Sequence, residues 1–218
     1  TLELEPALAV SAPEGKILEE GAYAGGVSYT FEIRPEAIWD NGSPVTAEDF
    51  LFTMKATFNP KVPAAPYRVY LSFIKEVEID AENPKRFTVY SDQKYIIGEE
   101  AISAALPVLP MHHYDSLGLM ADIPLPDLMD TEKAKALAES NEKINQFAEQ
   151  FTSPFFSRET EGVNGCGPYK LVRWETGQRL VLERKADWWG DQVEGAGIVM
   201  ESYPQEMIFR PIQDQTAA

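Results

Sequence analysis

Hydrophobic and polar residues alternate with a period of two in the segment VSYTFEIRP. Tyr29, Phe31 and Ile33 share one side of this run, and polar residues occupy the other side. Such alternation is typical of a β-strand with one buried face. We therefore expect a strand here that ends at Pro35.

Two further alternating runs, KEVEID and RFTVYSD, are joined by the turn-forming residues AENPK. This order predicts a β-hairpin. In such a hairpin, Val77 and Ile79 face one side of the sheet. Phe87 and Val89 face the same side and complete an apolar surface.

A helix is predicted after Thr46, because Thr46 as N-cap and Asp49 three residues later form the short version of a capping box. Its apolar stripe includes Met54 and Phe58. Pro60 disfavours helical geometry in the residue before it and ends the helix. The segment KVPAAPYRVYL follows, and its prolines and alanines predict a loop that carries Tyr67 and Tyr70.

Residues 130–151 predict one long amphipathic helix. Its apolar side holds Leu137, Ile144, Phe147 and Phe151, and most charges lie on the other side. Farther along, PYKLVRWETGQRLVLERKADWWG predicts two strands that turn at Thr176-Gly177.

In this second hairpin we expect Leu180 and Leu182 to form one inward row, with Tyr169 and Leu171 as its partner row. The final segment, IVMESYPQEMIFRPIQDQTAA, begins another strand. We assign the tryptophans to packing, because each lies where a strand or turn needs a large apolar side chain. They are Trp39, Trp174, Trp188 and Trp189.

Composition limits the classes of partner. The 218 residues include 44% hydrophobic and 25% charged residues, which is ordinary for a globular protein. Thirty-five acidic residues against 19 basic ones give a net charge of −16, which disfavours nucleic acids and anionic membranes. No apolar run is long enough to span a bilayer, and no signal peptide opens the chain.

One cysteine and two histidines are the main candidates for metal or nucleophilic chemistry. His112 and His113 are adjacent, so on a strand they point to opposite faces and do not chelate one ion together. A Cys-His hydrolase built on Cys166 is the alternative, but Cys166 lies in a Gly-rich bend before a strand and lacks the helix N-terminus typical of activated thiols. A reading without any such chemistry is also open. In it, Cys166 is a small apolar residue, and the histidines form hydrogen bonds at the edge of a loop.

Two stretches, Tyr29 to Pro60 and Asn164 to Gly190, resemble the extracellular solute-binding proteins of family 5, which include oligopeptide, dipeptide and nickel-type binding proteins of ABC transporters. LEPALAVSAP before them resembles a further segment of that family. The resemblance implies an α/β fold, with mixed α+β in this part, of the periplasmic-binding-protein type II kind. Members of that family have two lobes that close on a ligand.

By this resemblance the chain corresponds to most of lobe I. Residues 1–163 would form the mixed sheet and helix subdomain with the aromatic loop, and residues 164–218 would form strands that return to the central sheet and lead toward the hinge. The opening strands and the second lobe would lie outside this sequence. The family position of Cys166 usually holds threonine or another small residue, so we expect the thiol to be filler and the flanking glycines to allow close backbone packing.

The resemblance implies a reversible binding protein, not an enzyme, without a cofactor. It would bind a peptide or similar small solute and deliver it to membrane permease subunits, as a monomeric periplasmic or cell-surface protein or lipoprotein. Tyr67 matches the family position that places an aromatic side chain in the cleft, and Tyr70 is a second candidate. Two alternatives stay open: a Cys/His hydrolase, and a sensor or chaperone-like protein that uses the same lobe without a transporter.

Overall fold

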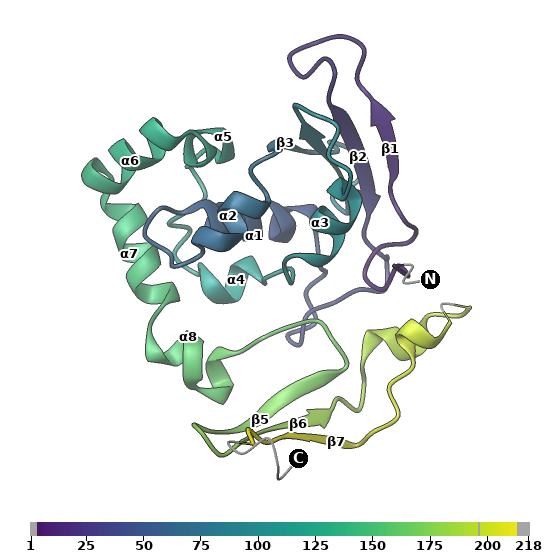
Figure 1. The fold of residues 1–218 in the computed structure, drawn as a ribbon. Helices are drawn as coiled ribbons and strands as arrows, with labels where there is room; N and C mark the ends of the chain where they lie inside the picture. The colour runs from purple at the N-terminus through teal and green to yellow at the C-terminus, as the bar shows by residue number, and fades with distance from the viewer. Residues whose placement is uncertain (1–3, 196, 213–218) are drawn as a thin grey trace.

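A computed structural model describes residues 4–195 and 197–212. The chain forms a four-stranded and a three-stranded antiparallel sheet, with most of the helices grouped beside the larger sheet (Figure 1). The strands are β1 (Glu14–Ile17), β2 (Val27–Glu32), β3 (Ile74–Ile79), β4 (Arg86–Ser91), β5 (Tyr169–Glu175), β6 (Arg179–Arg184) and β7 (Glu206–Phe209). The helices are α1 (Ala47–Phe58), α2 (Ala65–Tyr70), α3 (Gly98–Ala104), α4 (Met111–Tyr114), α5 (Leu125–Met129), α6 (Thr131–Ser140), α7 (Glu142–Phe151) and α8 (Pro154–Arg158).

The larger sheet has the strand order β1-β2-β4-β3. β3 and β4 form the predicted hairpin, in which Val77 lies opposite Val89 and Ile79 lies opposite Phe87. The alternation predicted for β2 is also confirmed, because its apolar residues are buried while Thr30 is exposed.

Helix α1 packs against the apolar face of this sheet. The Phe50 ring stacks on Phe87 with 4.4 Å between ring centroids, and Phe87 stacks on Phe31 at 5.3 Å. Burial of each such side chain contributes about 1.5–3 kcal/mol. The capping box is confirmed, because the Thr46 amide donates to Asp49 Oδ2 at 2.9 Å, and the helix ends at Phe58 as predicted.

Residues 65–70 form helix α2, so the expected loop is wrong in this part. Pro66 lies in the first turn, where its missing N–H removes no hydrogen bond from the helix. In the sequence pattern, proline and alanine close after a helix end predict only that the helix stops. Six residues are also too few for a helical period to emerge from the sequence pattern.

The single long helix predicted for residues 130–151 is two helices, α6 and α7. Asn141 between them has extended backbone angles, and its side chain accepts a hydrogen bond from the Lys143 amide at 3.0 Å. This cap competes with continued helix at Asn141. The inward side was predicted correctly, since all four expected residues pack against the core: Leu137, Ile144, Phe147 and Phe151.

The histidine pair lies on the short helix α4, whereas the expectation that the pair does not share a metal ion assumes strand geometry. Pro110 ends the extended segment before it, and the chain turns into a short helix at Met111. His112 and His113 still have different neighbours. His112 approaches the edge of Trp39, while His113 packs against Tyr114.

The smaller sheet, β5-β6-β7, contains the predicted turn at Gly177, whose φ is 75°. The inward row expected at Leu180 and Leu182 is wrong, because both are half-buried and Val181 between them is buried. Three successive apolar residues give no period-two signal, so the sequence pattern could not select the buried face. The final segment does contain a strand, β7, but the strand begins only at Glu206, because Ile198–Met200 form a short 3-10 helix. Residues 213–218 of the same tail lie outside the described residues.

Three of the four tryptophans are buried as expected, at Trp39, Trp188 and Trp189. Trp174 is an exception, because its side chain is 36% exposed. It lies directly across from Leu180 in the adjacent strand, on the more exposed face of the smaller sheet. The assignment of Trp174 to packing is therefore wrong.

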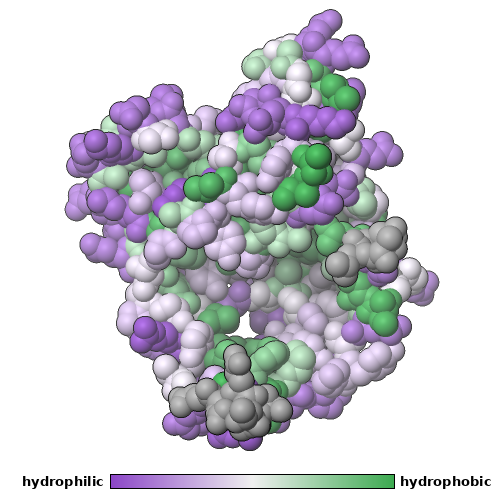
Figure 2. Space-filling view, in the orientation of Figure 1, coloured by the Kyte–Doolittle hydropathy of each residue, from purple (hydrophilic) through white to green (hydrophobic). Residues whose placement is uncertain are grey.

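The smaller sheet lies apart from the larger body, and Figure 2 shows the surface hollowed between them. Hydrogen bonds around residues 162–168 connect the two parts. Lys185 Nζ donates to Asp40 Oδ1 and to the Gly165 carbonyl oxygen. The Asn164 amide donates to the Tyr114 hydroxyl at 3.2 Å. We call this region, in which residues 162–168 meet Asp40, Tyr114 and Lys185, the junction.

Candidate functional site

Helix α2 carries both tyrosines that the sequence predicted as ligand-binding residues. Tyr67 is 47% exposed and Tyr70 is 38% exposed. Residues three apart lie on neighbouring positions of a helix surface, so the two rings share one side of α2. Their exposure leaves them available to a solute, and their role in binding stays a prediction.

Arg68 fixes this helix to the body of the protein. Its Nη1 donates to three backbone carbonyl oxygens at and beyond the end of α1: Thr57 at 3.0 Å, Asn59 at 3.2 Å and Val62 at 3.0 Å. The last carbonyls of a helix lack partners within it, so an arginine here satisfies them. Burial lowers the pKa of Arg68. Arg68 therefore orients α2, and with it the side that carries the tyrosines.

Sequence reasoning did not identify Arg68. The available signal was an arginine between two tyrosines, close after a helix end marked by Asn59-Pro60. Basic side chains near a helix C-terminus often bind its free carbonyls. The folding of residues 60–70 back over the end of α1 was not predictable, because it depends on the turn at Val62 to Ala64.

A groove of about 920 Å³ runs between α2, the start of β3 and helices α5 and α6. Its walls include the apolar residues Phe58 and Leu128. The charged residues of its lining are four basic ones and one acidic one: Lys61, Arg68, Lys75, Lys135 and Asp130. The whole chain has a net charge of −16, because acidic residues outnumber basic ones. The charged residues of this groove, by contrast, are mostly basic. The groove can accept apolar groups and neutral or negatively charged ones beside them.

The surroundings of Cys166 do not activate its thiol. Burial raises the pKa of Cys166 to about 11, although the positive charge of Lys185 acts in the opposite direction. The Cys166 carbonyl oxygen accepts hydrogen bonds from the indole N–H groups of Trp188 at 2.9 Å and Trp189 at 2.7 Å. A nucleophilic cysteine requires a lowered pKa and a nearby base. The half-buried thiol packs against the core instead.

The expected role of the glycines beside Cys166 is wrong. A Cβ atom on Gly165 or Gly167 would meet no described atom within 4 Å, so close backbone packing does not require glycine at either position. The close approach lies at Gly162, where a Cβ would be 1.9 Å from the Phe155 carbonyl oxygen. His113 Nε2 donates to the Gly162 carbonyl oxygen at 3.0 Å, which fixes this segment against α4.

Within residues 4–195 and 197–212, no three His, Cys, Asp or Glu side chains lie close enough together to hold a metal ion. His113 forms its hydrogen bond to the Gly162 carbonyl, and its ring packs against Phe156. The described helices are also all too short or too polar to cross a membrane.

Comparison with known proteins identifies the family. A family model described as "Bacterial extracellular solute-binding proteins, family 5 Middle" matches residues 3–218. The periplasmic oligopeptide-binding protein OppA of Escherichia coli K12 is 28% identical over 165 residues, which are 75% of this chain and 26% of OppA. The probable peptide-binding protein YejA of Agrobacterium fabrum is 26% identical over 180 residues, which are 79% of this chain and 24% of YejA.

Solved structures with the same fold include an oligopeptide-binding protein from Thermus thermophilus in complex with a pentapeptide. Its TM-score is 0.65 at 22% identity, with 98% of this chain and 34% of that chain covered. NikZ from Campylobacter jejuni, in complex with Ni(L-His), has a TM-score of 0.58 at 22% identity, with 99% and 32% covered. These similarities confirm the predicted mixed α/β fold.

The chain spans about a quarter of the length of the curated relatives that it matches, 26% in OppA and 24% in YejA. These two relatives are named as binding proteins, which at the level of the family favours the expected binding role over the alternative of a Cys/His hydrolase. The match over nearly the whole chain shows that this protein belongs to the bacterial extracellular solute-binding proteins of family 5.

Proposed function

We propose that this chain is part of the solute-binding component of an ABC importer and that the solute is a peptide. The observation that carries the proposal is the family match over residues 3–218. Peptide binding is supported by the names of the relatives, which include oligopeptide-binding and peptide-binding proteins. The protein would act in the periplasm or at the cell surface and pass its solute to permease subunits.

In this proposal, α2 presents Tyr67 and Tyr70 to the solute. Tyrosine suits the role because its ring offers apolar contact area and its hydroxyl can form a hydrogen bond. Arg68 holds the helix through three backbone carbonyls, so little ordering is required when the solute arrives. Peptide main-chain groups and side chains would supply the remaining contacts.

Transport requires that the solute favour one conformation of the whole protein. A solute that binds more tightly to a closed arrangement of two lobes shifts the population toward it. The residues of the present chain would form one side of that cleft. No covalent step is needed, which agrees with the raised pKa of the Cys166 thiol.

Native mass spectrometry of the protein that carries this chain, purified from its own host, tests the proposal. We expect peptides bound in a one-to-one complex. Calorimetric titration with the recovered peptides then gives their affinity. A protein that arrives without a solute and binds no member of a random peptide library would contradict the proposal.

A further inference from the structure

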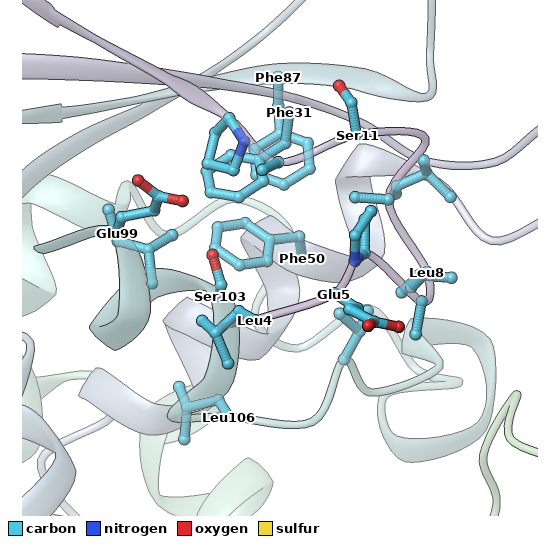
Figure 3. A pocket seen from close by; sticks show the side chains of 18 of the residues that line it. Leu4, Glu5, Leu8, Ser11, Phe31, Phe50, Phe87, Glu99, Ser103 and Leu106 are labelled. Carbon is cyan, nitrogen blue, oxygen red and sulfur yellow. The ribbon is translucent and has the colours of Figure 1, made fainter. Parts of the chain in front are cut away.

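A separate cavity of about 310 Å³ lies between residues 4–13 and the apolar face of the larger sheet (Figure 3). Strands β2 and β4, helix α1 and helix α3 form its other walls. None of its described lining residues belongs to α2 or to the groove beside α2. The cavity is therefore distinct from the predicted solute site.

The inner wall of this cavity is aromatic. Phe31, Phe50 and Phe87 form a continuous stack, and Figure 3 shows their rings grouped together. All three are buried, and Ile33 and Ile102 extend the same surface. An apolar wall of this kind favours the binding of apolar groups.

Residues 4–13 are attached to the body by several hydrogen bonds. The Val10 amide donates to the Glu32 carbonyl at 2.8 Å, and the Arg34 amide donates to the Leu8 carbonyl at 2.9 Å. The Arg34 side chain donates from Nε to the Ala7 carbonyl at 2.7 Å. These bonds hold the outer wall in place, so the cavity is formed before any ligand enters.

The cavity lining includes two carboxylates, those of Glu5 and Glu99. Among the described residues, no lysine, arginine or histidine lines the cavity. The field of Glu99 extends to a neighbouring group, since burial and then the charge of Glu99 raise the pKa of Tyr29. An apolar ligand with a positive charge would match both the aromatic wall and these carboxylates.

We propose that this cavity binds a small aromatic amine, with the ring against the phenylalanines and the ammonium group beside Glu99. A cavity of about 150 Å³ holds a benzene molecule. The volume of about 310 Å³ found here therefore suits one ring with a short alkyl chain. It lies at the lower end of the range of about 300–1,000 Å³ for small-molecule sites.

Calorimetric titration with 2-phenylethylamine tests the proposal, with the neutral 2-phenylethanol as the matched ligand. We expect the amine to bind more tightly. Glu99→Gln should weaken amine binding about threefold, as expected for a partly exposed ion pair, and leave the alcohol unchanged. Glu100→Gln is the matched control, because Glu100 carries the same charge on the same helix but does not line the cavity.

Ser103→Phe should block both ligands, since Ser103 lines the cavity from the exposed side of α3 and a ring there fills it. Tyr67→Ala should leave both affinities unchanged, which separates this site from the solute site. Nuclear Overhauser contacts between ligand ring protons and the Ile102 methyl groups show directly, in the unsubstituted protein, that the ligand occupies the cavity. Absence of binding in the millimolar range, or binding without these contacts, would overturn the proposal.

Discussion

At the scale of single residues, Asp49 has a larger structural role than its sequence position predicts. The sequence identifies it as one member of a capping box. In the structure, its Oδ2 also accepts a hydrogen bond from the Trp39 indole at 3.1 Å, and its Oδ1 accepts one from the Met111 amide at 3.0 Å. The buried carboxylate thus joins the start of α1, the turn before it and the start of α4.

Asp49→Ala should lower the free energy of unfolding by about 3 kcal/mol or more, because several donors lose their acceptor inside the protein. Urea denaturation measures the change. Glu48→Ala is the control, since it removes an exposed carboxylate from the same helical turn and should cost about 0.5 kcal/mol. Equal effects of the two substitutions would show that Asp49 acts only through its charge.

The Cys166 thiol should react slowly with iodoacetamide in the folded protein. Burial raises its pKa from 9.0 to about 11, so at about pH 8 the thiolate fraction falls about 100-fold. The rate should rise with pH up to about 11. The same protein in denaturant provides the reference rate, and equal rates in both states would show that the thiol is not shielded.

Tyr67→Ala should weaken solute binding with little change in the free energy of unfolding, because the ring is half exposed. Loss of an aromatic anchor costs about 1 kcal/mol or more, which is about fivefold or more in affinity. Tyr203→Ala removes another exposed tyrosine far along the chain and serves as control. Reduced stability with unchanged affinity would identify Tyr67 as a packing residue.

At the scale of secondary structure elements, the sequence pattern predicted β2, the β3-β4 hairpin and α1 because each has a clear period and clear end signals. It failed where one capping residue or proline decides the local geometry. Asn141 divides a stretch whose apolar period is otherwise continuous. Pro66 lies in the first turn of a helix where the sequence pattern predicts a loop.

Asn141→Ala should destabilise the protein by about 1 kcal/mol, the usual effect of removing an asparagine N-cap. The reason is that the Lys143 amide would lose its side-chain acceptor. Thermal unfolding followed by circular dichroism measures this change. Ser140→Ala, at the exposed end of α6, should change stability much less. A stabilising effect of Asn141→Ala would mean that α6 and α7 can join into one helix.

At the scale of the whole molecule, the sequence could not predict how the two sheets meet. The junction depends on contacts between residues far apart in the chain, such as Lys185 with Asp40. It also depends on backbone acceptors such as the Cys166 carbonyl. The candidate site was predictable only as two tyrosines, because its supporting residue, Arg68, acts through backbone carbonyls that no sequence pattern identifies.

The central claim is that the protein holds a solute reversibly and changes no bond in it. The most direct measurement is calorimetric titration with a peptide recovered from the native protein, followed by release of the bound peptide and determination of its mass. The account predicts saturable one-to-one binding and a peptide of unchanged mass after prolonged incubation. Cleaved or modified peptide that accumulates with time, and no longer does so after Cys166→Ala, would contradict it.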